Sequence, residues 1–132
     1  MLRTLVGHGR RVIAALCVVA AAACGHLGMG GPPPADAYII FHNESLDQAD
    51  VFGVAPGTDF VRLGTVFPGR VDTLRVRSSV IGQGSGVNIV VRLLARTNTP
   101  STGNIPLHSG DFFDVRLTAD GRSLVALPSA SP

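Results

Sequence analysis

Two histidines and one carboxylate are the side chains best suited to acid–base chemistry. His42 follows an apolar, β-branched run, and His108 comes just before a turn, with Asp111 three residues further on. If the fold brought the three together, Asp111 would orient an imidazole that moves protons in a small hydrolase or a metal-dependent enzyme. No nucleophile-elbow sequence accompanies them. We therefore expect solvated or hydrogen-bonded histidines, no catalytic residue and no metal site.

Arginines form the second candidate site. All 11 basic residues are arginine, and several alternate with apolar residues in predicted strands. Five of them could form an outward stripe: Arg62, Arg75, Arg77, Arg92 and Arg96. Such a stripe would attract an anionic ligand, for example a glycan or a lipid headgroup. It equally fits a solvated sheet face, in which arginines pair with carboxylates such as Asp72 or Asp114 on neighbouring strands.

The elements that must position these residues are strands. From Ala37 onward the apolar pattern has period two, and no segment has the period of a long helix. Turn signals at Pro56-Gly57, Pro68-Gly69 and Asp120-Gly121 separate the apolar runs. About seven short strands at roughly ten-residue spacing predict an all-β fold, a small antiparallel two-sheet sandwich. Its topology is either immunoglobulin-like or transthyretin-like.

The strand pattern also predicts some of the pairing. Three consecutive segments with short turns predict a meander: residues 49–55, 59–66 and 71–77. Residues 87–94 predict a central strand, because apolar residues interrupt its polar face. Residues 97–110 predict a long polar connection with a short edge piece at 105–108, where a proline argues against a central position. The last two strands, 111–117 and 123–127, form a hairpin.

Charge and cysteine content exclude two classes of function. Three of the 11 arginines precede Cys24, whereas all nine acidic residues follow it, so the later chain has eight arginines against nine carboxylates. Without a basic block there is no electrostatic footprint for nucleic acid. Both cysteines, Cys17 and Cys24, lie in the N-terminal segment, so the later chain can form no internal disulfide and no thiolate metal site. We expect no cofactor.

The N-terminal segment has the features of an export signal. Arg10 and Arg11 precede an unbroken apolar run from Val12 to Ala23. At about a dozen residues the run is shorter than the roughly 20 needed to cross a bilayer. Its end, Ala21-Ala22-Ala23-Cys24, resembles the lipobox of a bacterial lipoprotein signal peptide. This resemblance implies cleavage before Cys24 and lipidation of the Cys24 thiol, and it does not extend to the residues that follow.

These segments predict a four-part chain. Residues 1–23 are a helical signal peptide, 24–36 a flexible Gly/Pro tether, 37–128 the sandwich and 129–132 a frayed tail. The acyl chains on Cys24 would bind the membrane and hold the domain in the cell envelope, facing the periplasm or the exterior. In such lipoproteins an aspartate directly after the lipidated cysteine favours retention in the inner membrane. Residue 25 is a glycine instead, so we expect the outer membrane.

The functional expectation is a non-enzymatic, lipid-anchored envelope protein whose sandwich is a binding or structural module, with an envelope protein or a glycan as partner. One alternative is a small envelope hydrolase or metal-dependent enzyme that uses His42, His108 and Asp111. The other is an accessory subunit of an envelope assembly. A pocket that gathers the three residues would favour the enzyme, whereas scattered histidines would favour the module. A bare aliphatic face or an unpaired edge strand would favour the subunit.

Overall fold

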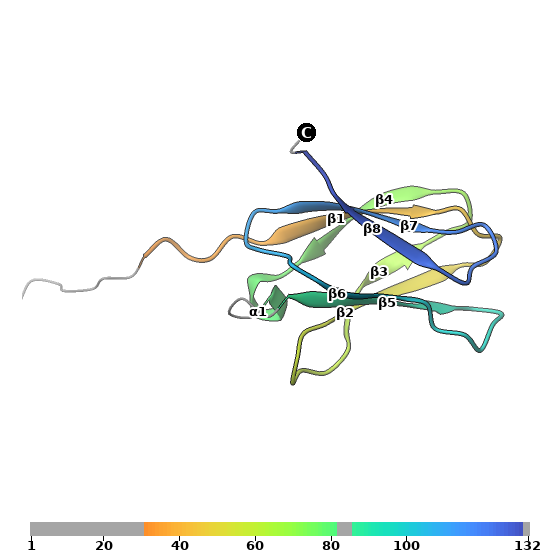
Figure 1. Cartoon of the computed structure of the whole chain (residues 1–132), viewed down its shortest axis with the longest axis horizontal. Coiled ribbons are helices and arrows are strands. Elements are labelled where there is room, and N and C mark those ends of the chain that lie inside the picture. The colour runs from red at the N-terminus through yellow and green to blue at the C-terminus, as the bar shows by residue number, and fades with distance from the viewer. Residues whose placement is uncertain (1–30, 82–85, 131–132) are drawn as a thin grey trace, which may run out of the picture. The chain divides into compact units, whose positions relative to one another are not determined.

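The computed structural model describes residues 31–81 and 86–130, which fold almost entirely into strands (Figure 1). The predicted signal peptide, Cys24 and most of the predicted tether lie outside these residues, as do residues 82–85. The strands are β1 Ala37–Asn43, β2 Ala49–Val54, β3 Val61–Val66, β4 Val71–Val76, β5 Val87–Leu93, β6 Ser101–Ile105, β7 Phe112–Leu117 and β8 Leu124–Pro128. A single helical turn, α1 (Ser78–Ile81), lies between β4 and β5.

The strands form two packed four-stranded sheets, which confirms the predicted all-β sandwich. Sheet A has the order β4-β1-β7-β8 and sheet B the order β3-β2-β5-β6; the two layers lie one above the other in Figure 1. All neighbouring pairs are antiparallel except β1 and β7, which run parallel. Six chain reversals separate β1 from β7, so the two strands run in the same direction.

The strand order also decides between the two topologies. In the immunoglobulin order the first two strands pair within one sheet, next to the fifth and the fourth. Here β1 and β2 lie in different sheets, and β1 sits between β4 and β7. The immunoglobulin-like alternative is therefore excluded, and the transthyretin-like one remains.

The predicted meander is wrong at its last strand. β3 pairs with β2 as expected, but β4 leaves for the other sheet and pairs with β1. The turn at Pro68-Gly69 causes this crossing. The Gly69 amide donates to the Asn43 carbonyl at 2.8 Å, and the Asn43 amide donates to the Arg70 carbonyl at 2.9 Å. Because these bonds begin the β1–β4 ladder at the turn itself, β4 cannot continue beside β3.

The predicted edge piece at residues 105–108 is displaced toward the N-terminus. β6 ends at Ile105, and Pro106 follows it directly. A proline cannot donate to the ladder, so the strand forms before it rather than around it. β6 pairs only with β5 and is an edge strand. As a result the fold has eight strands among the described residues rather than about seven.

The core lies between the sheets and is formed by alternate residues of the inner strands. The largest fully buried aliphatic and aromatic side chains include Ile39, Phe41, Val51, Ile89, Val91, Val115 and Leu117. Val80 and Ile81 from α1 and Leu107 from the β6–β7 connection join the same core. β5 is an inner strand of sheet B, so its predicted central position is confirmed.

Two neighbouring positions on β5 test this register. Val91 is 0% exposed, whereas Arg92 is exposed on the opposite face. Val91→Asn would bury an amide without partners, and we expect it to lower the free energy of unfolding by about 3 kcal/mol or more. Arg92→Asn brings in the same side chain at the surface and should cost no more than about 1 kcal/mol. Urea denaturation of both variants measures the difference; equal losses would contradict the register.

Candidate functional site

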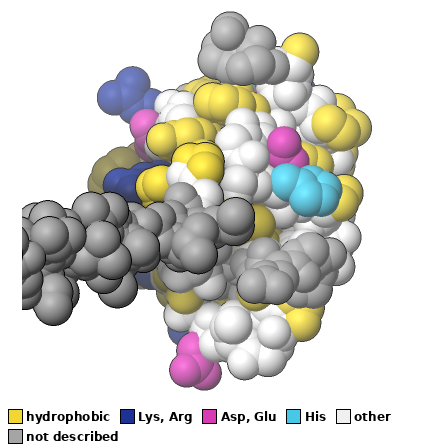
Figure 2. Space-filling view, turned by 90° about the vertical axis from the view of Figure 1, so that its left-hand side faces the viewer, with side chains coloured by type: hydrophobic (Ala, Val, Ile, Leu, Met, Phe, Trp, Pro, Cys, Tyr) yellow, Lys and Arg dark blue, Asp and Glu magenta, His cyan; other side chains and the backbone are white. Residues whose placement is uncertain are grey.

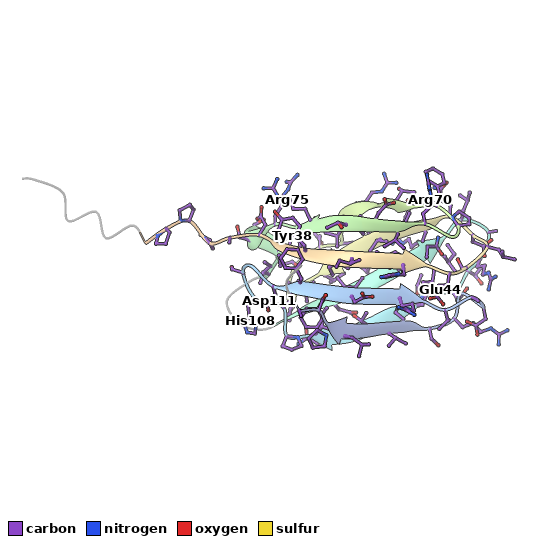
Figure 3. All side chains as sticks on the ribbon, turned by 90° about the horizontal axis from the view of Figure 1, so that it is seen from above. Tyr38, Glu44, Arg70, Arg75, His108 and Asp111 are labelled. Atoms are coloured by element: carbon purple, nitrogen blue, oxygen red, sulfur yellow. The ribbon has the colours of Figure 1, made fainter. Side chains whose placement is uncertain are left out.

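The structure does not bring His42, His108 and Asp111 together. His108 Nδ1 lies 3.2 Å from Asp111 Oδ2, but His42 Nε2 contacts Asp114 instead, at 3.0 Å. The parallel pairing of β1 with β7 places His42 about five residues, or about 16 Å, further along the sheet than Asp111. Figure 3 shows Asp111 and His108 at one end of the sheet and Glu44, two residues after His42, at the other.

Each histidine lies beside a carboxylate of its own, and neither of the two pairs is fully buried. His42 and Asp114 lie side by side on the outer face of sheet A, and the His42 Nε2 atom has no well-aligned hydrogen bond. Asp111 accepts the backbone amide of His108 at 2.9 Å, so its carboxylate closes a turn. The exposed histidine in Figure 2 has a carboxylate directly beside it. Within residues 31–81 and 86–130, no three His, Cys, Asp or Glu side chains gather to hold a metal ion.

The five predicted arginines do not form one stripe, so that part of the prediction is wrong. Arg96 donates to Asp47 at 2.6 Å and to the Asp120 carbonyl, and it ties two loops at one end of the sandwich. Arg92 lies over the rings of Phe52 and Phe60, 5.1 and 5.5 Å from their centroids. The arginines are separated because their strands belong to different sheets. Alternation along a strand predicts which face a side chain lies on, but it does not predict to which sheet the strand belongs.

The other three arginines meet at one edge of the sandwich. Arg62 from β3, and Arg75 and Arg77 at the end of β4, line a cleft of about 380 Å³ together with Val61 and Leu63. Val61 and Leu63 are partly buried against the core, so they give the cleft an apolar floor. β3 and β4 are edge strands of different sheets and share no ladder, which leaves the space between them open to solvent.

A glycine determines how closely these two edge strands approach. A side chain at Gly64 would place its Cβ 2.8 Å from Leu74 Cδ2, a distance that real Cβ atoms do not show. Leu74, which is 7% exposed, therefore packs directly over Gly64 and would have to move if residue 64 carried a side chain. The arginine cleft lies next to this contact, between the start of β3 and the end of β4.

Carboxylates balance two of the three arginines. Arg75 binds Asp36 Oδ2 through both Nε and Nη2 at 2.5 Å, and Arg62 binds Asp50 at 2.7 Å. The backbone amide of Ser78 and then Arg75 hold the pKa of Asp36 below its ordinary value. Asp36 and Asp50, whose pKa values are both lowered, are therefore ionised at neutral pH. Basic and acidic side chains lie next to one another on the side shown in Figure 2.

The pKa of Asp50 is lowered in the same way, by the hydroxyl of Thr65 first and then by Arg62. Arg77 differs from its neighbours, because its guanidinium forms no direct ion pair within the described part of the chain, although its charge helps to lower the pKa of Asp36. The cleft thus holds three cations against two anions, and Arg77 supplies the charge that is not balanced.

Sequence reasoning missed the residues that organise this cleft. It proposed Asp72 and Asp114 as partners of the arginines, whereas Asp36 and Asp50 fill that role. Asp36 falls in the segment predicted as tether and lies 39 residues from Arg75. No local pattern marks such a pair. Asp50 alternates with apolar residues on β2 and lies on the face that also carries Arg62. That alternation was the one sequence feature that could have indicated Asp50 as the partner of an arginine.

Comparison with known proteins does not assign the chain to a family. No protein-family model matches the chain, and no curated protein matches it. Among residues 31–81 and 86–130, no helix has the length and apolar character needed to cross a membrane.

Proposed function

We propose that this protein is a lipid-anchored, non-enzymatic component of the cell envelope, and that its sandwich binds an anionic group at the arginine cleft. The observation that carries the binding role is the meeting of Arg62, Arg75 and Arg77 over an apolar floor. The lipobox-like Ala21-Ala22-Ala23-Cys24 supports the anchor. Acyl chains on Cys24 would hold the domain at the outer membrane, by preference, with no membrane-binding surface needed on the sandwich itself.

The chemistry of the cleft favours a phosphate-like or carboxylate-like group attached to a less polar body. Guanidinium groups donate two parallel hydrogen bonds to such anions. Arg77 is available for this contact because no carboxylate of the described residues forms a direct ion pair with its guanidinium. Val61 and Leu63 would contact the apolar or sugar portion of the ligand. A lipid headgroup and an anionic glycan share this chemistry.

The placement of the histidines supports a binding module over an enzyme. His42 and His108 lie at opposite ends of sheet A, each beside its own carboxylate. Each acid–base residue must lie within hydrogen-bond distance of the atom whose proton it transfers, so the residues of one catalytic site must surround one substrate. A separation of about 16 Å along the strands does not permit that for this set.

A second candidate function, a subunit of an envelope assembly, is favoured by one observation. β8 is an edge strand without charged residues, and its side chains Val125 and Leu127 are exposed. An edge strand without charged residues is available for pairing with another chain over the residues before Pro128.

Lipidation of Cys24 is the first prediction. Intact mass spectrometry of the membrane fraction should show a chain that begins at Cys24 and carries additional acyl mass. Cys24→Ala should move the protein to the soluble fraction, because the acyl chains would be its membrane attachment. A soluble wild-type chain that begins elsewhere, or a Cys24→Ala variant that stays in the membrane fraction, would contradict the anchor.

Anion binding at the cleft is the second prediction. Titration calorimetry with inorganic phosphate and with a short-chain phosphatidylglycerol should show binding of at least one of them. Arg77→Gln should weaken it about fivefold or more, since a charged hydrogen bond of about 1 kcal/mol is lost. Asp36→Asn should strengthen binding, because it releases Arg75 from its carboxylate.

Arg70→Gln is the matched control, since Arg70 is exposed at the other end of β4 and lies outside the cleft. Binding of phosphatidylglycerol but not phosphate would assign the ligand to lipid headgroups, whereas equal binding of both would assign it to the free anion. Equal losses for Arg77→Gln and Arg70→Gln would contradict the cleft and indicate a general charge effect.

A further inference from the structure

The four edge strands of the sandwich are not equally protected against pairing with another chain. β3 and β4 carry charged side chains, among them Arg62, Asp72 and Arg75. β6 contains Gly103 at a φ of 69°, and its register against β5 is irregular. Charges, irregularities and left-handed residues all hinder strand addition. β8, with the sequence LVALP, has no charge, glycine or irregular pairing, and Pro128 at its end is its one protecting residue.

The main-chain groups on the outer side of β8 can be assigned from its ladder with β7. The Thr118 amide donates to the Ser123 carbonyl at 3.1 Å, and the Ser129 amide donates to the Phe112 carbonyl at 3.0 Å. Hydrogen-bonded residues alternate along an antiparallel pair. Alternate residues of β8 therefore turn their main-chain groups to the free edge: Leu124, Ala126 and Pro128.

Pro128 fits this assignment, because a proline in a sheet lies where its missing N–H would face solvent. The outer side of β8 is left with two donors, the amides of Leu124 and Ala126, and three acceptors, the carbonyls of Leu124, Ala126 and Pro128. β8 is the last strand of sheet A, so no strand of this chain's described part uses these groups. Figure 3 shows β8 as the outermost strand of the sheet.

The side chains between these positions are apolar and exposed. Val125 is 47% exposed and Leu127 is 60% exposed, on the outer face of sheet A. Asp114 and Arg116 flank them on β7, opposite Leu127 and Val125 respectively. The edge is therefore an uncharged strand bordered by one acid and one base.

We propose that β8 pairs in antiparallel fashion with β8 of a second copy of this chain, and so joins the two A sheets into one. With Ala126 opposite Ala126 of the second copy, the two Ala126 amides and carbonyls bond reciprocally. Each Leu124 amide then donates to the Pro128 carbonyl of the other copy, and Pro128 has no N–H to donate to the Leu124 carbonyl in return. The missing proline donor is thereby placed where it leaves only one carbonyl per chain unpaired.

The same register makes the side chains self-complementary, and this is what selects a second copy as the partner. Val125 lies opposite Leu127 of the second copy, and Leu127 opposite Val125 of the second copy, so both exposed pairs are covered. Along each row, Arg116 of one copy and Asp114 of the other flank the apolar pair with opposite charges. No like charges meet, because β8 has no charged residue.

This interface is independent of the proposed anion site. The arginine cleft lies on the β3–β4 edge, and β8 lies at the opposite end of sheet A. Loss of anion binding therefore leaves the dimer intact, and loss of the dimer leaves anion binding intact.

Sedimentation of the full chain in density-matched detergent tests the proposal. The wild type should sediment as a dimer, and the double variant Val125→Lys with Leu127→Lys as a monomer, because four lysines would meet across the interface. Val71→Lys is the matched control, since Val71 is 54% exposed on β4, at the other edge of the same sheet, and its variant should stay dimeric. A monomeric wild type, or a double variant that remains dimeric, would overturn the proposal.

Cysteine crosslinking checks the register and does not depend on the lysine variants folding. A mixture of Val125→Cys and Leu127→Cys chains should form a disulfide between copies, whereas Val125→Cys alone should form much less. The wild type reports any crosslinking through Cys17 or Cys24. Crosslinking of Val125→Cys to itself at the level of the mixture would overturn the proposed register.

Discussion

The arrangement of both sheets depends on one buried side chain, Asn43 at the end of β1. It is 1% exposed, and its amide nitrogen donates to the carbonyls of Val66 and Asp47 at 2.9 Å each. Its amide oxygen accepts the hydroxyl and the backbone amide of Ser45. Each of these groups would cost about 1–3 kcal/mol if left buried without a partner. Asn43 thus joins the end of β3 in sheet B to the end of β1 in sheet A, where the chain crosses between the sheets.

This junction has a consequence at the β3–β4 edge, where the arginines meet. Because the backbone of Asn43 binds the turn at Gly69 and Arg70, β4 enters sheet A instead of extending sheet B. β3 and β4 therefore face each other as edges of different sheets, with Leu74 packed over Gly64. The charges of Arg62, Arg75 and Arg77 discourage strand addition at both edges, and the three side chains line the cleft for which we propose anion binding. The opposite edge has no such charges, and the proposed dimer follows from that difference.

The alternation of apolar and polar residues was sufficient to predict where the strands lie. It could not predict which strands pair with one another over long distances in the sequence. Alternation and the interrupted polar face located residues 87–94 in a central strand, and the structure confirms this with a fully buried Val91 on β5. The same alternation could not assign β4 to a sheet, because a Pro-Gly turn serves a hairpin and a crossing equally well. Asparagine is common in ordinary turns, so the sequence does not single out Asn43. Only the burial of its side chain in the structure reveals its role. The arginine stripe failed for the same reason, since Arg62 and Arg75 belong to different sheets.

The central claim is that three arginines, brought together by the crossing of β4, form the anion site. The most direct measurement follows the side-chain Nε–H signals of arginine by NMR while inorganic phosphate is added to the isotope-labelled protein. The signals of Arg62, Arg75 and Arg77 should shift together and saturate, while those of Arg92 and Arg96, held by aromatic rings and by Asp47, should stay unchanged. Shifts of equal size at all five arginines, or none at Arg77, would contradict the account.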